Sequence, residues 1–175
     1  FLNNKTTTAL PPLTLILGGQ RSGKSAYAES LIGEGCKAVY LATGQALDDE
    51  MNARIALHRA RRGDHWSTLE EPLDLAAALK GARQPLLIDS LAMWVANLLQ
   101  AGRDVEAETL ALVQALESIK SAVVIVSDEV GLGVIPENAL AREFIDALGL
   151  ANQQIAARAE RVILITAGLA QVLKG

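Results

Sequence analysis

Short apolar stretches alternate along the chain with longer segments in which apolar residues recur at helical spacing. The apolar stretches, bounded by polar or small residues, predict strands at 13–17, 37–42, 85–89, 122–127 and 161–166. The helical spacing predicts helices over 24–33, 46–62, 72–81, 90–101, 104–119 and 136–159. Such alternation is typical of parallel sheets with right-handed crossovers. The expected fold class is therefore α/β, with a mostly parallel central sheet flanked by helices.

Composition narrows the protein class. The chain has 175 residues, half of them hydrophobic and 3% aromatic, which suits one domain over 13–175 with a polar arm at 1–12. The net charge of −4 and pI of about 5.2 argue against nucleic acid as a partner. No apolar run is long enough to span a membrane and no signal peptide is evident, so a cytoplasmic location is expected.

The first predicted strand leads directly into Gly18-Gly19-Gln20-Arg21-Ser22-Gly23-Lys24-Ser25. This is G-x-x-x-x-G-K-S, the phosphate-binding loop, in its expected place between a strand and a helix. The backbone N–H groups of such a loop cradle phosphate oxygens, and the helix dipole favours the same anion. Lys24 is placed to contact the outer phosphates, and the Ser25 hydroxyl to bind Mg²⁺. We therefore expect nucleotide phosphate binding.

Polar or small residues follow every predicted strand. Because ligands bind beyond the carboxyl ends of strands in open α/β sheets, these clusters should form one rim around the phosphate loop. They are Gly18-Gly19, Thr43-Gly44-Gln45, Asp89-Ser90, Ser127-Asp128-Glu129 and Thr166-Ala167-Gly168. Asp89 is expected to hold Mg²⁺. Its alternative is to cap the helix over 90–101, for which Ser90 is an equal candidate.

The predicted helix over 46–62 combines an acidic start with a basic end, which complements a helix dipole. Arg54, His58, Arg61 and Arg62 form a basic stripe along it. Two interpretations stay equally open: a solvated charged face, or a phosphate site whose neutral histidine attacks phosphorus.

Three other segments carry weaker signals. His65 and Trp66 are expected to lie in a turn or short strand and to pack as a structural pair. Glu70 and Glu71 precede Pro72 and are candidates to cap the next helix, with a ribose or base contact as the weaker option. The glycine-containing segment 128–138 is either a flap over a substrate or a plain connection.

Several of these stretches together resemble a known family. They are LILGGQRSGKS, YLATGQALDDEMNARIALHRARR, HW, LLIDSLAMWVANLL and DEVGLGVIPENALAREF. In order and spacing, from about Leu13 onward, they are similar to the bifunctional adenosylcobinamide kinase / adenosylcobinamide-phosphate guanylyltransferases (CobU/CobP). The resemblance implies a RecA-like P-loop NTPase domain, usually a homotrimer, in cobalamin biosynthesis.

The resemblance also implies two reactions and their residues. ATP or GTP phosphorylates adenosylcobinamide; GMP then passes from GTP through a histidine to adenosylcobinamide phosphate, giving adenosylcobinamide-GDP and pyrophosphate. The family's guanylylated histidine matches His58, with Lys24 as the second catalytic residue. The implied nucleotide contacts are Gly18 to Ser25, Ala42, Thr43, Gly44, Arg59, Ala60, Arg61, Arg62, Glu70 and Asp89, and the implied metal ligands are Ser25 and Asp89.

Among the positions that depart from the family pattern, two bear on the chemistry. Leu57 precedes His58 where some members have a second histidine. Asp128 stands where asparagine is common, and its charge is expected either to weaken anion binding or to bind metal. Two other functions stay open on the sequence: a P-loop kinase for another small alcohol without guanylyl transfer, and a nucleotide-gated binding module.

Overall fold

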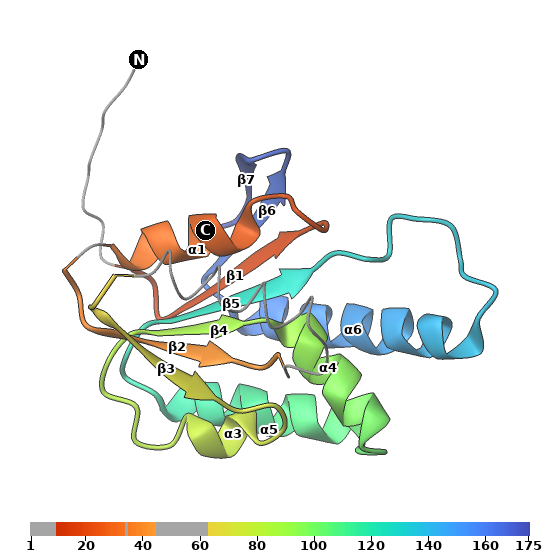
Figure 1. The fold of residues 1–175 in the computed structure, drawn as a ribbon, viewed down its shortest axis with the longest axis horizontal. Coiled ribbons are helices and arrows are strands. Elements are labelled where there is room, and N and C mark those ends of the chain that lie inside the picture. Colours follow the sequence, from red (N-terminus) through yellow and green to blue (C-terminus); the bar gives the residue numbers. More distant parts are fainter. Residues whose placement is uncertain (1–9, 34, 45–62) are drawn as a thin grey trace.

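The computed structural model describes residues 10–33, 35–44 and 63–175, and the predicted helix over 46–62 lies outside them. A seven-stranded sheet in the order β3-β2-β4-β5-β1-β6-β7 forms the centre of this part of the chain (Figure 1). The strands are β1 (Leu13–Gly18), β2 (Ala38–Ala42), β3 (Trp66–Glu70), β4 (Leu86–Asp89), β5 (Val123–Asp128), β6 (Arg161–Thr166) and β7 (Leu169–Lys174). The helices are α1 (Lys24–Ile32), α3 (Leu75–Ala78), α4 (Leu91–Gln100), α5 (Val105–Ser118) and α6 (Ala139–Arg158).

All strand pairs are parallel except β6–β7, which confirms the predicted fold class. β1 lies between β5 and β6, with both its edges paired. β5 separates β1 from β4. The carboxyl ends of these parallel strands therefore meet at one edge of the sheet, where the predicted rim lies.

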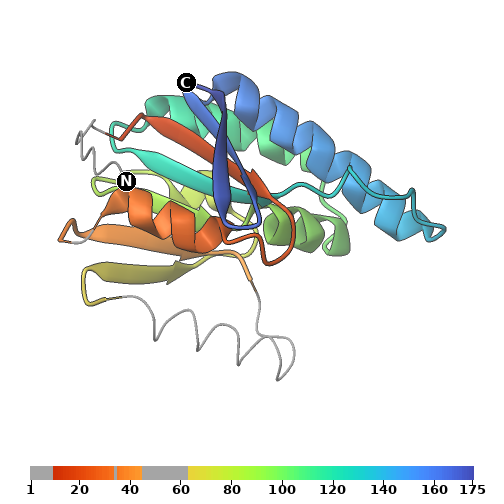
Figure 2. The same ribbon diagram turned by 90° about the horizontal axis from the view of Figure 1, so that it is seen from above.

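Successive residues of the central strands pack into two separate cores, one on each face of the sheet. Leu15 and Leu17 face the core that includes residues of α3 to α6, whereas Ile16 faces the core that includes α1. Figure 2 shows α1 on the face opposite α5 and α6. Because side chains alternate along a strand, burial on both faces requires the continuous apolar run that predicted these strands.

Two helices depart from the predicted bounds by more than one residue at an end. In place of a helix over 72–81, α3 has four residues. The Glu71 carboxylate accepts hydrogen bonds from the N–H groups of Leu73 and Asp74, at 3.0 and 2.8 Å, so a turn occupies the start of this segment. α6 begins at Ala139, not near 136, because Asn138 is its N-cap and accepts from the Ala141 N–H at 3.1 Å.

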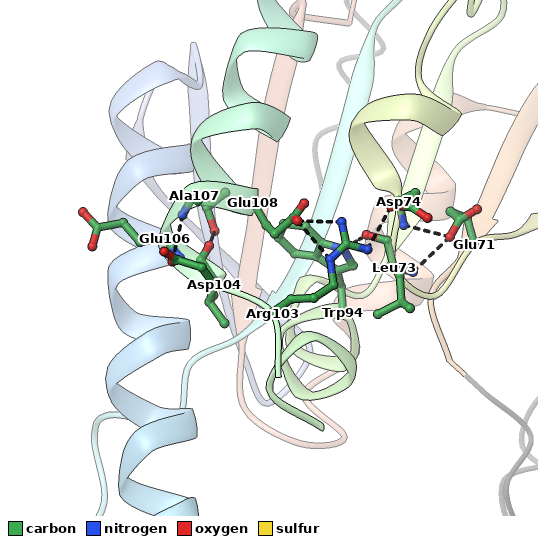
Figure 3. Close-up of polar contacts among 11 residues, drawn as sticks. Glu71, Leu73, Asp74, Trp94, Arg103, Asp104, Glu106, Ala107 and Glu108 are labelled. Atoms are coloured by element: carbon green, nitrogen blue, oxygen red, sulfur yellow. Dashed lines mark hydrogen bonds and ion pairs between the residues drawn. The ribbon is translucent and has the colours of Figure 1, made fainter. Parts of the chain in front are cut away.

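A network of polar contacts holds the turn after β3 against α4 and α5 (Figure 3). Arg103 binds Asp74 at 2.8 Å through Nη1 and Glu108 at 2.9 Å through Nε. The Trp94 indole N–H donates to the Leu73 carbonyl at 2.7 Å. Hydrogen bonds to Asp74 and then Glu108 raise the pKa of Arg103, so this residue stays charged. The network fixes the chain just after the rim residue Glu70.

Neither β3 nor β7 is among the five predicted strands, although β3 begins at Trp66, where a turn or short strand is expected. Both lie at edges of the sheet and are largely exposed, so neither has a continuous apolar run. A two-residue turn joins β6 to β7, and both its residues, Ala167 and Gly168, have positive φ (51° and 79°). That backbone conformation matches the twist of a hairpin.

None of the helices in the described ranges combines the length and apolarity that crossing a bilayer requires.

Candidate active site

The loop after β1 has the backbone that a phosphate-binding loop requires. At Gly18, a Cβ atom would lie 2.5 Å from Ser22 Oγ and 2.7 Å from the Ile165 carbonyl oxygen, so only glycine fits. At Gly23, φ is +98°, in the region that favours glycine. The Ser22 N–H donates to the Gly19 carbonyl at 3.2 Å, and the Gly168 N–H donates to the Ser22 carbonyl at 2.9 Å. The loop is thus fixed both internally and against the β6–β7 turn.

α1 begins at the end of this loop without a side-chain cap. Its N-cap is Gly23, which offers no acceptor to the first-turn N–H groups. Uncapped donors and the positive end of the helix dipole together favour an anion here. Gly19, Gln20 and Arg21 are exposed, whereas Ser22 and Ser25 are half-buried.

Lys24 is buried between the loop and β5. Its Nζ donates to the Gly19 carbonyl at 3.1 Å and lies 2.5 Å from Oδ1 of Asp128 as an ion pair. Parallel pairing places Asp128 opposite Gly18, on the strand next to β1. The predicted rim cluster at Ser127-Asp128-Glu129 therefore adjoins the phosphate loop.

Asp89 ends β4 and is not the cap of α4. Ser90 is the N-cap, and its Oγ accepts from the Met93 N–H at 3.3 Å, which decides between the two capping candidates. Asp89 Oδ2 instead accepts a hydrogen bond of 2.8 Å from the Tyr40 hydroxyl. The carboxylate is thereby oriented at the rim by a neighbouring strand.

The residues at the rim fit Mg²⁺ as a partner of bound phosphates. Magnesium keeps several waters and takes one or two carboxylates with substrate phosphates, so the Asp89 carboxylate and the Ser25 hydroxyl suffice as protein donors. Across the described ranges, no group of three or more His, Cys, Asp or Glu side chains forms a metal cage.

The segment after β2 is fixed by two residues of the β4–α4 region. Thr43 Oγ1 donates to the Ser90 carbonyl at 2.7 Å and accepts from the Ser90 N–H at 2.9 Å. Asn97 Nδ2 donates to the carbonyls of Thr43 and Pro72, at 2.8 and 3.1 Å. Ala42, which pairs with Asp89, and Thr43 thus have a fixed place beside Asp89. Asn97 is not among the site residues expected from the sequence, although an asparagine among the apolar residues of α4 was an available signal.

Glu70 lies at the far end of the rim. It ends β3, pairs in register with Ala42 and is exposed. Four strand spacings separate β3 from β1, about 19 Å in all, so the rim has room for an extended ligand. Of the two capping candidates, Glu71 binds the backbone of the following turn.

The remaining expected site residues lie outside the described part of the chain. They are His58, Arg59, Ala60, Arg61 and Arg62. His65 does pack against Trp66, with ring centroids 5.6 Å apart, as expected of a structural pair.

The site defines a P-loop nucleotide-binding protein with a RecA-like sheet. Its parts are a strand, a glycine loop with a buried lysine, a helix, and an acid at the rim two strands away. The chain belongs to the CobU family, described as cobinamide kinase / cobinamide phosphate guanyltransferase, whose family model matches residues 14–173. The bifunctional adenosylcobalamin biosynthesis protein CobP of Pseudomonas aeruginosa is 49% identical over 167 residues, covering 92% of this chain and 96% of that protein. The bifunctional adenosylcobalamin biosynthesis protein CobU of Escherichia coli K12 is 39% identical over 180 residues, covering 93% of this chain and 99% of that protein.

Solved structures support the fold. A type III secretion ATPase of pathogenic bacteria superposes with a TM-score of 0.54 at 13% identity, covering 91% of this chain and 52% of the ATPase. A Pyrococcus horikoshii OT3 protein superposes with a TM-score of 0.58 at 8% identity, covering 97% of this chain and 89% of that protein.

Proposed function

We propose that this chain carries out both reactions of its family at the rim. In the first, the hydroxyl oxygen of adenosylcobinamide attacks the γ-phosphorus of ATP or GTP. The bond between the γ-phosphorus and the β,γ-bridging oxygen breaks, the nucleoside diphosphate leaves, and the hydroxyl loses its proton to solvent. In the second, a histidine nitrogen attacks the α-phosphorus of GTP and pyrophosphate leaves. A phosphate oxygen of adenosylcobinamide phosphate then displaces the histidine, giving adenosylcobinamide-GDP.

One observation carries the proposal: the phosphate loop and Asp89 share an edge of the sheet in a chain that matches this family over nearly its whole length. Lys24 and the first turn of α1 would hold the phosphates, and fixed cations and N–H donors stabilise charge that develops during transfer. Ala42, Thr43, Gly44 and Glu70 would contact the nucleoside beyond them. Ser25 and Asp89 would hold Mg²⁺, which neutralises phosphate charge and orients the reacting groups.

His58 is the residue that we assign as the nucleophile, with Arg59, Ala60, Arg61 and Arg62 as nucleotide contacts. Family membership favours this assignment over a solvated charged face. It also favours the bifunctional enzyme over a kinase for another alcohol or a nucleotide-gated module, because neither needs a guanylylated histidine. We further propose that residues 13–175 act as one catalytic domain, that the enzyme is a homotrimer, and that it works in the cytoplasm, where ATP and GTP are available.

The deciding experiment is covalent labelling with Mg²⁺ and GTP that carries its label at the α-phosphate. We expect acid-labile, base-stable label on the wild-type chain. His58→Ala should abolish the label and leave the phosphorylation of adenosylcobinamide by ATP largely intact. His65→Ala is the matched control and should keep the label, since His65 packs on Trp66. Labelling that persists in His58→Ala would contradict the assignment of the nucleophile.

A further inference from the structure

The lysine of the phosphate loop is already paired with a carboxylate. Lys24 Nζ lies 2.5 Å from Asp128 Oδ1 and donates to the Gly19 carbonyl at 3.1 Å. The Lys24 and Asp128 side chains are only 10% and 22% exposed, so solvent and salt screen the pair weakly. A phosphate that approaches this ammonium therefore approaches a carboxylate as well.

The backbone at Asp128 is fixed from two sides. On one side, the Glu129 N–H donates to the Gly18 carbonyl at 3.1 Å. On the other, Asn152 of α6 donates from Nδ2 to the Asp128 carbonyl at 3.1 Å and accepts from Ser127 Oγ at 2.6 Å. Ser127 and Asn152 are both buried. The backbone at Asp128 consequently cannot move away from the loop without breaking these hydrogen bonds.

The sheet order places Asp128 where the outer phosphates are expected. β5 lies between β1, which leads into the loop, and β4, which ends in Asp89. The lysine of such a loop reaches the β- and γ-phosphates, so these groups would lie beside Asp128. Like charges placed together at a binding site cost free energy and reject the more highly charged ligand.

We propose that Asp128 makes this phosphate loop select the Mg²⁺ complex of a nucleoside triphosphate over the free triphosphate. The inference rests on the proposed function, in that the loop binds nucleotide. A bound divalent cation cancels part of the phosphate charge, and so relieves the repulsion that Asp128 imposes on the free triphosphate. Asp128 is a specificity-determining residue for the form of the nucleotide.

The test compares dissociation constants of GTP by isothermal titration calorimetry, with excess EDTA and with saturating Mg²⁺. In wild type, the free nucleotide should bind much more weakly than its Mg²⁺ complex. Asp128→Asn removes the charge and keeps the size of the side chain. It should reduce the ratio of the two dissociation constants about tenfold, or about 1.4 kcal/mol, chiefly by tightening the binding of free GTP.

Glu117→Gln is the matched control. It makes the same change in net charge at an exposed residue of α5, paired with Arg158 at 2.8 Å, and should leave the ratio unchanged. Circular dichroism and thermal unfolding check the fold of each variant, and Asp128→Ser replaces Asp128→Asn if the latter is unfolded.

Two outcomes would overturn the proposal. One is an unchanged ratio in the Asp128 variants. The other is an equal loss of affinity for both forms of GTP, because Asp128 would then only orient Lys24. If wild type binds neither form, the proposed function itself fails, which this experiment distinguishes from a failure of the Asp128 assignment.

Discussion

The Tyr40 hydroxyl and the Asp89 carboxylate join two neighbouring strands through a hydrogen bond of 2.8 Å at the rim. Tyr40 belongs to β2 and is 5% exposed, and Asp89 ends β4. The Tyr40 ring packs edge-to-face on Trp66, with ring centroids 6.0 Å apart, which fixes the direction of the hydroxyl. Tyr40 thus sets the orientation of the acid that we propose as a metal ligand.

Removing only the Tyr40 hydroxyl should weaken the affinity of the enzyme for Mg²⁺. Tyr40→Phe keeps the ring contact with Trp66 but frees the Asp89 carboxylate to rotate. Partners of a metal ligand typically affect metal affinity, so we expect the Mg²⁺ concentration for half-maximal kinase activity to rise roughly tenfold. Tyr27→Phe, on half-buried Tyr27 of α1, is the control. An equal response in the two variants, or none in either, would refute the positioning role.

The two adjacent glycines of the phosphate loop should respond differently to alanine. A Cβ at Gly18 would meet the Ile165 carbonyl at 2.7 Å, whereas nothing lies within 4 Å of one at Gly19. Gly18→Ala should lower the free energy of unfolding by about 1–3 kcal/mol through overpacking. Gly19→Ala should stay within about 0.5 kcal/mol of wild type. Urea unfolding measures both, and equal losses would contradict the loop geometry.

Lys24→Ala should impair both proposed reactions, because one ammonium serves the phosphates in each. We expect kcat for phosphoryl transfer to fall by about 100-fold or more, as when a fixed donor to developing charge is lost. Labelling of the chain by α-labelled GTP should fall with it. Lys80→Ala, at an exposed lysine outside the rim, should change neither. Normal phosphoryl transfer in Lys24→Ala would show that the kinase site lies elsewhere.

Local sequence spacing was enough to predict the central strands and the phosphate loop. β1, for example, is buried on both faces, so all its residues before Gly18 except Thr14 are apolar, and it ends at Gly18, where a side chain would clash with Ile165. β3 and β7 escaped prediction because they are stabilised by pairing with β2 and β6 and not by burial of their own side chains.

The candidate site was predictable residue by residue but not contact by contact. Lys24, Asp89 and Asp128 each stand out beside a motif or at a strand end. Their partners depend on strand order, which pairs Tyr40 with Asp89 across 49 residues of sequence. Asn97 and Asn152 likewise contact rim residues that are distant in sequence, each from a helix. Such contacts follow from the assembled sheet, and no local pattern encodes them.

Asn97 offers a test of whether the segment after β2 contributes to nucleotide binding. Its amide is the buried donor to the carbonyls of Thr43 and Pro72. Asn97→Ala should cost about 1–3 kcal/mol of unfolding free energy, because buried acceptors lose their partner. If Ala42 to Gly44 contact the nucleotide, the same variant should raise the dissociation constant of Mg²⁺–GTP roughly tenfold, or about 1.4 kcal/mol.

The control for Asn97 is Asn138→Ala, which removes the N-cap of α6 at an exposed position. It should cost about 1 kcal/mol of stability and leave GTP affinity unchanged. Calorimetric titration with Mg²⁺–GTP, at a temperature where both variants are folded, separates the two effects. A destabilised Asn97→Ala variant with wild-type affinity would mean that Asn97 supports the fold alone, and that the nucleotide does not depend on the position of Thr43.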